Sequence, residues 1–373
     1  MISVVDLLTL SQVPHVGASR LRTLVSHFAD TSEIFKASAR DIAVVEGFSK
    51  KLASLTAHFF KNSGLDDGRR YAEYQLSRLN KINGRIITFW DKVYPDHLRK
   101  IYDPPPFLFM RGEVKENDKY SIAMVGTRSP SDYGMTLAEK FSQEFAQMGI
   151  TVVSGLARGV DTVAHASAVK HGGRTIAVIG SGLDVMYPQE NKSLSERIAE
   201  HGAVLSEYEM GTKPDAVNFP RRNRLISGIS LGTLVVETDI DGGAMITANS
   251  ALDQNREVFA IPGSITSKRS RGCNVLIKDG KAKLVESLDD ILCELSNKLR
   301  PLLPNTGNER QKSLPSLSLF ERNLHDALTE NPQHIDVIAE RLNTSTADAL
   351  VNLLSLEFKG LVRQLPGKLF MKM

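Results

Sequence analysis

The residues of this chain that are best suited to binding chemistry lie in one stretch, Phe-Pro-Arg-Arg-Asn-Arg-Leu-Ile-Ser-Gly, from Phe219 to Gly228. Proline is tolerated at the first position of a helix, so Pro220 predicts a short helix that opens with three arginines. Positive side chains there oppose the helix dipole, so local stability does not explain them. A phosphate would reverse that cost, because backbone N–H groups and guanidinium groups would converge on it. Arginines paired with nearby carboxylates are the alternative interpretation.

Length and composition indicate a soluble globular protein. The 373 residues are 42% hydrophobic and 24% charged, which is enough for two or three domains. The net charge of +3 is small, so any charge argument depends on local distribution. Cys273 and Cys293 are too few for a Cys-rich zinc site or a disulfide scaffold. The sequence has no signal-peptide pattern and no membrane-spanning apolar run, so we expect a cytoplasmic location.

Residues 1–65 predict a small helical domain of the SAM or helix-hairpin-helix type. Residues 16–21 and 45–52 form two turns, each followed by a helix, and such turns can present backbone amides to a phosphate. Each turn has one glycine where the stronger pattern has two. A helical packing module without nucleic-acid contact is therefore the favoured interpretation.

Residues 66–296 predict an α/β domain with a doubly wound, mostly parallel sheet of the extended Rossmann-like class. Buried apolar strands separated by amphipathic helices are typical of such a sheet. The expected strands span 85–91, 107–111, 121–126, 151–154, 175–180, 203–206, 234–237 and 258–261. The expected helices span 136–148, 160–170, 191–200 and 245–252.

The C-terminal part predicts a linker and a second module. Residues 297–318 contain several prolines and no periodicity, which is typical of a linker. In residues 319–373, three short helices and a hairpin at 362–372 predict a winged-helix-like domain. Its last helix, 346–358, is mainly apolar and acidic, so protein contact or packing explains it as well as DNA binding does.

Four loops are expected to meet at the carboxyl ends of the strands, where open α/β sheets bind ligands. They comprise residues 126–130, 154–161, 180–182 and 219–228, with Lys213 just upstream of the last. Together they bring arginines and glycines to one rim, which predicts an anion site. A second basic run at 256–283 would extend a phosphate track along the surface.

Several polar residues of these loops have predicted structural roles. Ser129 suits a helix N-cap, with Pro130 at the first helical position. Asp161 is expected to cap the helix that follows it. Glu237 and Asp239 are the best carboxylates for acid–base chemistry, although turn and capping roles are favoured for both.

Motifs of other phosphate chemistry are missing from the sequence. It has no P-loop pattern, and Gly180-Ser181-Gly182 lacks the full dinucleotide-binding spacing. His165 and His171 are too far apart on one helix to share a metal, and Ser154 has no evident base partner. We therefore expect no cofactor, no metal and no enzymatic activity.

The ordered motifs of the chain are Tyr94-Pro95, Asp103-Pro104-Pro105, Gly126-Thr127-Arg128, 154–161, Gly180-Ser181-Gly182, Tyr187-Pro188, Ser206-Glu207, 219–228, Glu237, Thr247-Ala248, 260–263 and 272–277. Taken together, they resemble the DNA-processing protein A (DprA or Smf) family, and their order makes the resemblance specific.

This resemblance implies a single-stranded DNA-binding protein of natural transformation. Such a protein protects incoming DNA, helps to load a RecA-type recombinase and forms a homodimer through its Rossmann-like domain. Carried over residue by residue, the implied DNA site comprises Gly126, Thr127, Arg128, Ser154, Gly155, Ala157, Arg158, Gly159, Lys213, Phe219, Arg221, Arg222, Asn223 and Arg224.

Two departures from the family pattern and one rival function remain. Thr127 replaces the commoner serine and keeps the hydroxyl, while Asp241-Gly242-Gly243 adds a negative charge near the rim. The rival is a nucleotide-phosphate-processing enzyme of the lysine-decarboxylase-like Rossmann type. In that enzyme Arg128 would bind a phosphate and Glu237 would handle a proton.

The sequence predicts that Arg128→Ala and Arg224→Ala each weaken DNA binding by roughly 1–3 kcal/mol, the range for charge-assisted hydrogen bonds. Thermal stability should stay unchanged or rise slightly, because a cation leaves a helix N-terminus. DNA titrations and melting curves on both variants check this. Lower stability with intact binding would instead identify structural ion pairs.

Overall fold

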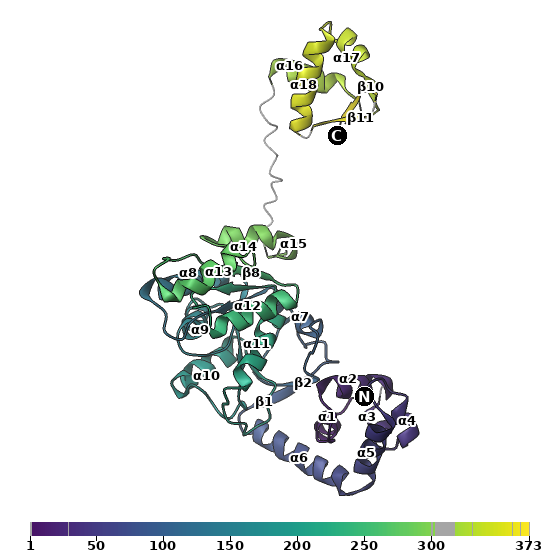
Figure 1. The fold of residues 1–373 in the computed structure, drawn as a ribbon, viewed down its shortest axis with the longest axis vertical. Helices are drawn as coiled ribbons and strands as arrows, with labels where there is room; N and C mark the ends of the chain where they lie inside the picture. Colours follow the sequence, from purple (N-terminus) through teal and green to yellow (C-terminus); the bar gives the residue numbers. More distant parts are fainter. Residues whose placement is uncertain are drawn as a thin grey trace. The chain divides into compact units, whose positions relative to one another are not determined.

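The computed structural model describes residues 2–28, 30–299, 301–302, 318–329, 331–359, 361–365 and 367–372. The chain divides into two compact units, the first of which ends at Leu302 (Figure 1). Residues 303–317, most of the predicted linker, lie outside the described residues.

The structure corrects the predicted start of the linker, which the sequence pattern places at residue 297. Residues 296–299 form a short helix, α15 (Ser296–Leu299), and Leu299 is fully buried in the core of the first unit. Leu302 packs against the same core. These apolar anchors attach the chain to the first unit up to Leu302, although the local sequence shows no periodicity.

A nine-stranded sheet organises the first unit. Its order is β1-β2-β6-β5-β4-β3-β7-β8-β9, and β2 alone runs against the other strands, antiparallel to its neighbours β1 and β6. The strands are β1 (Gly84–Thr88), β2 (Phe107–Gly112), β3 (Ser121–Val125), β4 (Thr151–Ser154), β5 (Thr175–Ile179), β6 (Ala203–Ser206), β7 (Gly232–Val235), β8 (Glu257–Ala260) and β9 (Lys283–Leu284). The expected doubly wound, mostly parallel sheet is confirmed.

Helices cover both faces of this sheet, because successive strand side chains point to opposite sides. Ile122 and Met124 of β3 belong to one buried cluster, which includes side chains of α8 (Asp132–Gln147), α9 (Val160–Lys170) and α14 (Leu288–Glu294). Ala123 and Val125 belong to another cluster. Its helices are α11 (Asn218–Ile229), α12 (Gly243–Asp253) and α13 (Lys268–Lys278). Helix α10 (Lys192–His201) packs near β6.

The predicted second basic run contains a helix that the sequence reasoning missed. Helix α13 buries Cys273 and Leu276 against the sheet, while Arg271 on its outer side pairs with Asp239. Lys283 likewise pairs with Glu294. Much of this run is therefore an amphipathic helix, and two of the run's cations, Arg271 and Lys283, are paired with carboxylates from other elements.

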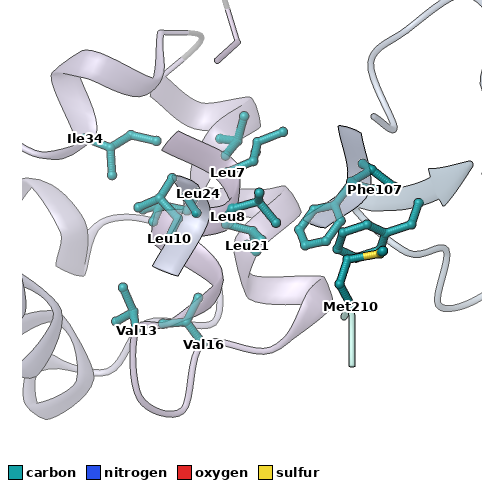
Figure 2. Close-up of a cluster of buried hydrophobic side chains, with 14 of the residues drawn as sticks. Leu7, Leu8, Leu10, Val13, Val16, Leu21, Leu24, Ile34, Phe107 and Met210 are labelled. Atoms are coloured by element: carbon teal, nitrogen blue, oxygen red, sulfur yellow. The ribbon is translucent and has the colours of Figure 1, made fainter. Parts of the chain in front are cut away.

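The described residues of the N-terminal module form the helices α1 (Val4–Ser11), α2 (Ala18–Phe28), α3 (Thr31–Ile34), α4 (Ala39–Ala43), α5 (Lys50–Lys61) and α6 (Ser63–Asn80). Arg20 holds its two turns together by donating to the carbonyl oxygens of His15 at 2.9 Å and Gly47 at 3.0 Å. Figure 2 shows leucines of α1 and α2 packed close to Phe107 of β2 and Met210. The module thus shares a core with the sheet.

The second unit has the predicted three helices and hairpin. They are α16 (Leu319–Ala327), α17 (Ile335–Arg341), α18 (Thr346–Phe358) and a small sheet of β10 (Gln333–His334), β12 (Leu369–Lys372) and β11 (Val362–Leu365). Their apolar side chains form a separate core that includes Leu324, Leu353 and Phe370. The winged-helix prediction is confirmed. Among the described helices, none has the length and apolarity needed to span a bilayer.

We predict that deleting residues 320–373 leaves the first unit folded and able to bind DNA, because the two units have separate cores. The melting transition of the truncated chain should stay cooperative and its DNA affinity should remain near that of the full chain. Loss of either cooperativity or most of the affinity would contradict this modularity.

Candidate nucleic-acid interface

A pocket of about 680 Å³ opens at the carboxyl ends of β3 and β7, where the strand order reverses direction. Its wall comprises Val125–Arg128 after β3, Ala157 and Asp161 after β4, Tyr187, Pro214 and Ala216, residues of α11, and Thr238 to Thr247 around the start of α12. A smaller hollow adjoins it and contains Gly155, Arg158, Gly180 and Pro188. The four predicted loops therefore converge.

The first loop is held by backbone hydrogen bonds on both sides. The amide of Thr127 donates to the carbonyl of Glu237 at 2.7 Å, and the amide of Val160 donates to the carbonyl of Thr127 at 3.2 Å. A Cβ on Gly126 would lie 2.5 Å from the Val160 side chain, so only glycine fits there. The backbone of this loop is therefore closely packed, while the Arg128 side chain is exposed at the pocket rim.

The second loop is closed by Asp161, whose carboxylate accepts from the amides of Gly155 at 3.1 Å and Ala157 at 3.2 Å. The predicted structural role of Asp161 is confirmed, but the N-cap position of α9 belongs to Gly159. Gly159 has a φ of +78°, and a Cβ there would lie 2.4 Å from the carbonyl oxygen of Thr127. Glycine at this position lets the first two loops pack against each other.

Arg158 extends from the second loop into solvent. Its guanidinium makes a bidentate pair with Glu190 at 2.8 and 3.0 Å, and the pair holds the pKa of Glu190 below its usual range. Both side chains are exposed, and exposed ion pairs contribute little to stability. A phosphate could therefore replace Glu190 at small cost.

Arg222 is buried beneath the pocket, with 4% of its surface exposed. Its guanidinium donates to the carbonyl of Gly155 at 2.7 Å and to that of Val178. Burial lowers the pKa of Arg222 to about 10, while the nearby Asp161 carboxylate opposes the shift. Arg222 stays protonated at neutral pH and joins α11 to β4 and β5.

Phe219 forms an aromatic platform between the pocket and the smaller hollow. Its ring lies 5.7 Å from that of Tyr187, centroid to centroid. The guanidinium carbons of Arg128 and Arg222 lie 5.6 and 6.0 Å from the ring centroid, within range of cation–π attraction. A Cβ on Gly180 would lie 3.0 Å from the ring, so the glycine makes room for it.

The remaining residues of the arginine stretch divide between the pocket and its surroundings. Asn223 lines the pocket and donates to the carbonyl of Gly243 at 3.4 Å. Arg221 is exposed, and so is Lys213, which immediately precedes the pocket residue Pro214. Arg128, Arg221 and Lys213 form no ion pair with any described residue. These three charges are therefore available to a ligand.

Arg224 does not line either hollow and is a correction to the predicted site. Its guanidinium donates to the Glu207 carboxylate at 2.7 Å and to the carbonyl of Asp103 at 2.7 Å. The Arg224 and Glu207 side chains are only 23% and 21% exposed, so the pair is structural. Burial raises the pKa of Glu207, and Arg224 opposes that rise. Of the two interpretations of the arginine stretch, pairing with a carboxylate rather than binding a phosphate therefore describes Arg224.

Ser154 is a second correction. It is fully buried at the end of β4, and its hydroxyl donates to the carbonyl of Met124 at 2.6 Å. The hydroxyl therefore ties β4 to β3 and does not reach the pocket. A strand-end serine looks the same in sequence whether its side chain points into the sheet or out of it.

Two helix starts also differ from prediction. Ser131 caps α8 by accepting from the amide of Gly134, so the predicted cap at Ser129 is wrong. Both carboxylate oxygens of Glu237 accept from Ser131, at 2.5 Å from its hydroxyl and 2.8 Å from its amide. Helix α11 begins at Asn218, and Pro220 is its third residue. Proline is harmless there because the first four N–H groups of a helix lack intrahelical partners.

Sequence reasoning did not assign Tyr187, Thr238 and the Gly242–Thr247 segment to the site, yet they line the pocket. Tyr187-Pro188 was visible as a motif, and Gly242-Gly243 as a departure from the family pattern. The strand order puts β7 beside β3 and so brings Thr238 and the segment around Gly242 to the pocket, while Tyr187 reaches it from the segment after β5.

Comparison with known proteins identifies this arrangement. The model of the family described as DNA recombination-mediator protein A matches residues 85–296, and that of the DprA winged helix domain matches residues 308–368. The chain belongs to the DNA recombination-mediator protein A family.

Individual members of the DNA recombination-mediator protein A family support the assignment. The Protein Smf of Synechocystis sp. is 34% identical over 391 residues, covering 96% of each chain. The X-ray structure of DprA from Streptococcus pneumoniae superimposes with a TM-score of 0.67 and 35% identity, covering 79% of this chain and 98% of that one. A DprA structure from Helicobacter pylori, whose description concerns its single-stranded DNA binding mode, gives a TM-score of 0.52 and 29% identity over 57% of this chain and 97% of that one.

The geometry divides two arginines that the sequence treated alike. We predict that Arg224→Ala lowers the free energy of unfolding by about 2–3 kcal/mol, because it leaves Glu207 half-buried without its partner. Arg128→Ala should leave stability unchanged and weaken DNA binding by roughly 1–3 kcal/mol. Denaturant unfolding and DNA titration on both variants measure this difference.

Arg224→Lys is the matched control, since it keeps the charge but loses the fork that spans Glu207 and Asp103. It should recover only part of the lost stability. Equal loss of DNA binding in both alanine variants, with unchanged unfolding, would contradict the structural role of Arg224.

Proposed function

We propose that this chain is a non-enzymatic protein that binds single-stranded DNA in the pocket around Phe219. The observation that carries the proposal is an aromatic ring in the pocket wall beside Arg128, whose charge pairs with no described carboxylate, at the convergence of glycine-containing loops. Aromatic rings stack with unpaired bases, and arginines neutralise the phosphates that connect them.

The exposed cations suit a phosphate backbone rather than a single phosphate group. Arg128 lies at the pocket rim, whereas Arg221 and Lys213 extend from the arginine stretch and from the segment before it. Arg158, on the second loop, can exchange the exposed Glu190 for a phosphate. Charges spread over several loops bind successive phosphates along a strand.

The shape of the site favours single strands over duplex. Phe219 and Tyr187 border a concave hollow, and a base must leave its stack to reach their faces. Bases of a duplex are paired and stacked, so reaching the hollow would cost a few kcal/mol of unstacking. Single strands avoid this cost.

The rival enzymatic function receives no support from the candidate acid–base group. In the rival function Glu237 would transfer a proton, but both its oxygens accept from Ser131 and its side chain is buried. The hydroxyl of Ser154 likewise donates to a backbone carbonyl, that of Met124 in β3. Incubation with nucleoside monophosphates should therefore release no free base, and release above background would favour the rival function.

The wider role rests on family membership. We propose that the chain acts in natural transformation, where it protects incoming single strands and helps to load a RecA-type recombinase, and that it works as a homodimer through the sheet domain. The match over residues 85–296, which includes the whole pocket, supports this role.

We predict a log–log salt dependence of affinity for single-stranded DNA with a slope of about −2 to −3, since three or four cations would each neutralise one phosphate at about −0.7 per contact. Fluorescence anisotropy with labelled oligonucleotides at several salt concentrations measures the slope. Arg128→Ala should make the slope shallower by about 0.7. Equal affinity for duplex and single-stranded DNA would count against the proposal.

A further inference from the structure

Tyr102 is fully exposed, with a relative accessibility of 102%, and lies in the turn before β2. A single exposed aromatic side chain needs no explanation by itself. Tyr102 differs from an ordinary surface residue in the support of its backbone and in its position relative to the pocket.

The backbone that carries Tyr102 is fixed from two directions. The carbonyl of Asp103 accepts from Arg224 of α11 at 2.7 Å, and its carboxylate pairs with Arg22 of α2 at 3.3 Å. Arg22 also donates to the carbonyl of Pro104. Prolines 104 to 106 restrict the chain further. The ring is therefore free, while its attachment is held in place before any ligand arrives.

The sheet brings this turn to the same edge as the pocket. Strand β2 is antiparallel to β6, and Phe109 pairs with Ser206 at the carboxyl end of β6. Residues that precede β2 therefore lie beyond the carboxyl end of β6, which neighbours β5. The smaller hollow, with Gly180, follows directly after β5.

Helix α11 connects the pocket to Tyr102. Phe219 borders the pocket, and Arg221 follows two residues later, exposed and without an ion pair to any residue that the structure describes. Arg224 comes one helical turn, about 5 Å along the axis, after Arg221 and binds the residue next to Tyr102. Arg221 thus lies on the same face of α11 as Arg224, the face that contacts the residue next to Tyr102. Phe219 points about 200° away around the helix, so a strand leaving the pocket would curve around the start of α11 to reach Arg221.

We propose that Tyr102 is a second stacking platform for single-stranded DNA, and that the strand leaving the Phe219 pocket runs over Arg221 to reach it. This inference rests on the proposed function. Arg221 neutralises a phosphate between the two platforms, and the Tyr102 ring stacks on a base beyond it. Glu207 and Asp103 lie along this path, but Arg224 and Arg22 offset their charges.

Length-dependent binding tests the proposal on the full chain. Oligothymidylates of about 4 and about 16 nucleotides span the site sizes typical of single-strand binding folds. Tyr102→Ala should weaken binding of the longer oligonucleotide by about 5- to 150-fold, the factor for 1–3 kcal/mol per stacked base. It should leave the shorter one, which fills the pocket alone, unaffected. Tyr102→Trp, which keeps an aromatic face, should retain the affinity of the parent chain.

Two further measurements locate the path. Arg221→Ala should make the salt slope for the longer oligonucleotide shallower by about 0.7. Single abasic positions moved along that oligonucleotide should weaken binding at two separate places in the parent chain, and at only one in Tyr102→Ala. Two affected places support a second platform.

The outcomes separate this inference from the proposed function. If the parent chain binds neither oligonucleotide, the proposed function fails. If it binds both and Tyr102→Ala matches it at both lengths, the pocket stands and the second platform is overturned. An equal loss at both lengths would also overturn it, because Tyr102 would then act on the pocket itself.

Discussion

The binding edge of this protein depends on one buried cation. Arg222 inserts its guanidinium between the ends of β4 and β5, where it donates to the carbonyls of Gly155 and Val178 and faces the Asp161 carboxylate. Removing water from a charge is costly unless donors and acceptors replace it, and here backbone carbonyls do so. Asp161 in turn accepts from two amides of the second loop. The position of α11 and the shape of that loop are therefore set by the same group.

Glycines make this arrangement sterically possible. A Cβ on Gly155 would lie 2.6 Å from the Arg222 guanidinium, and a Cβ on Gly159 would clash with the carbonyl oxygen of Thr127 in the first loop. Leu156, between them, has a φ of +55°, a conformation that few non-glycine residues adopt. Its side chain is fully buried, so packing compensates for the local cost. Because hydrogen bonds and close contacts hold these loops in place, binding is expected to lose little entropy in ordering them.

A second node joins the N-terminal helices to the same edge of the sheet. Asp103 receives Arg22 from α2 and Arg224 from α11, and Arg224 also pairs with Glu207 after β6. The tyrosine of the Tyr94-Pro95 motif holds the same segment, since its hydroxyl donates to the carbonyl of Pro105 at 2.8 Å. The helical module is therefore linked to the sheet by the Arg22–Asp103 ion pair and by the shared core around Phe107. Motifs that are far apart in the sequence meet at this contact.

The sequence by itself determined the strand and helix pattern, the winged-helix prediction and the set of loops that meet at the strand ends, because periodicity and glycine placement are local properties. It also singled out Arg128 and Phe219. Only the tertiary structure separated arginines of one stretch by role. Arg222 is buried, Arg224 is paired with Glu207, and Arg221 is exposed. Three arginines within four residues point in different directions around a helix. The partners of Arg222 and Arg224 lie in β5, just after β4 and β6, and in the turn before β2, which are elsewhere in the chain.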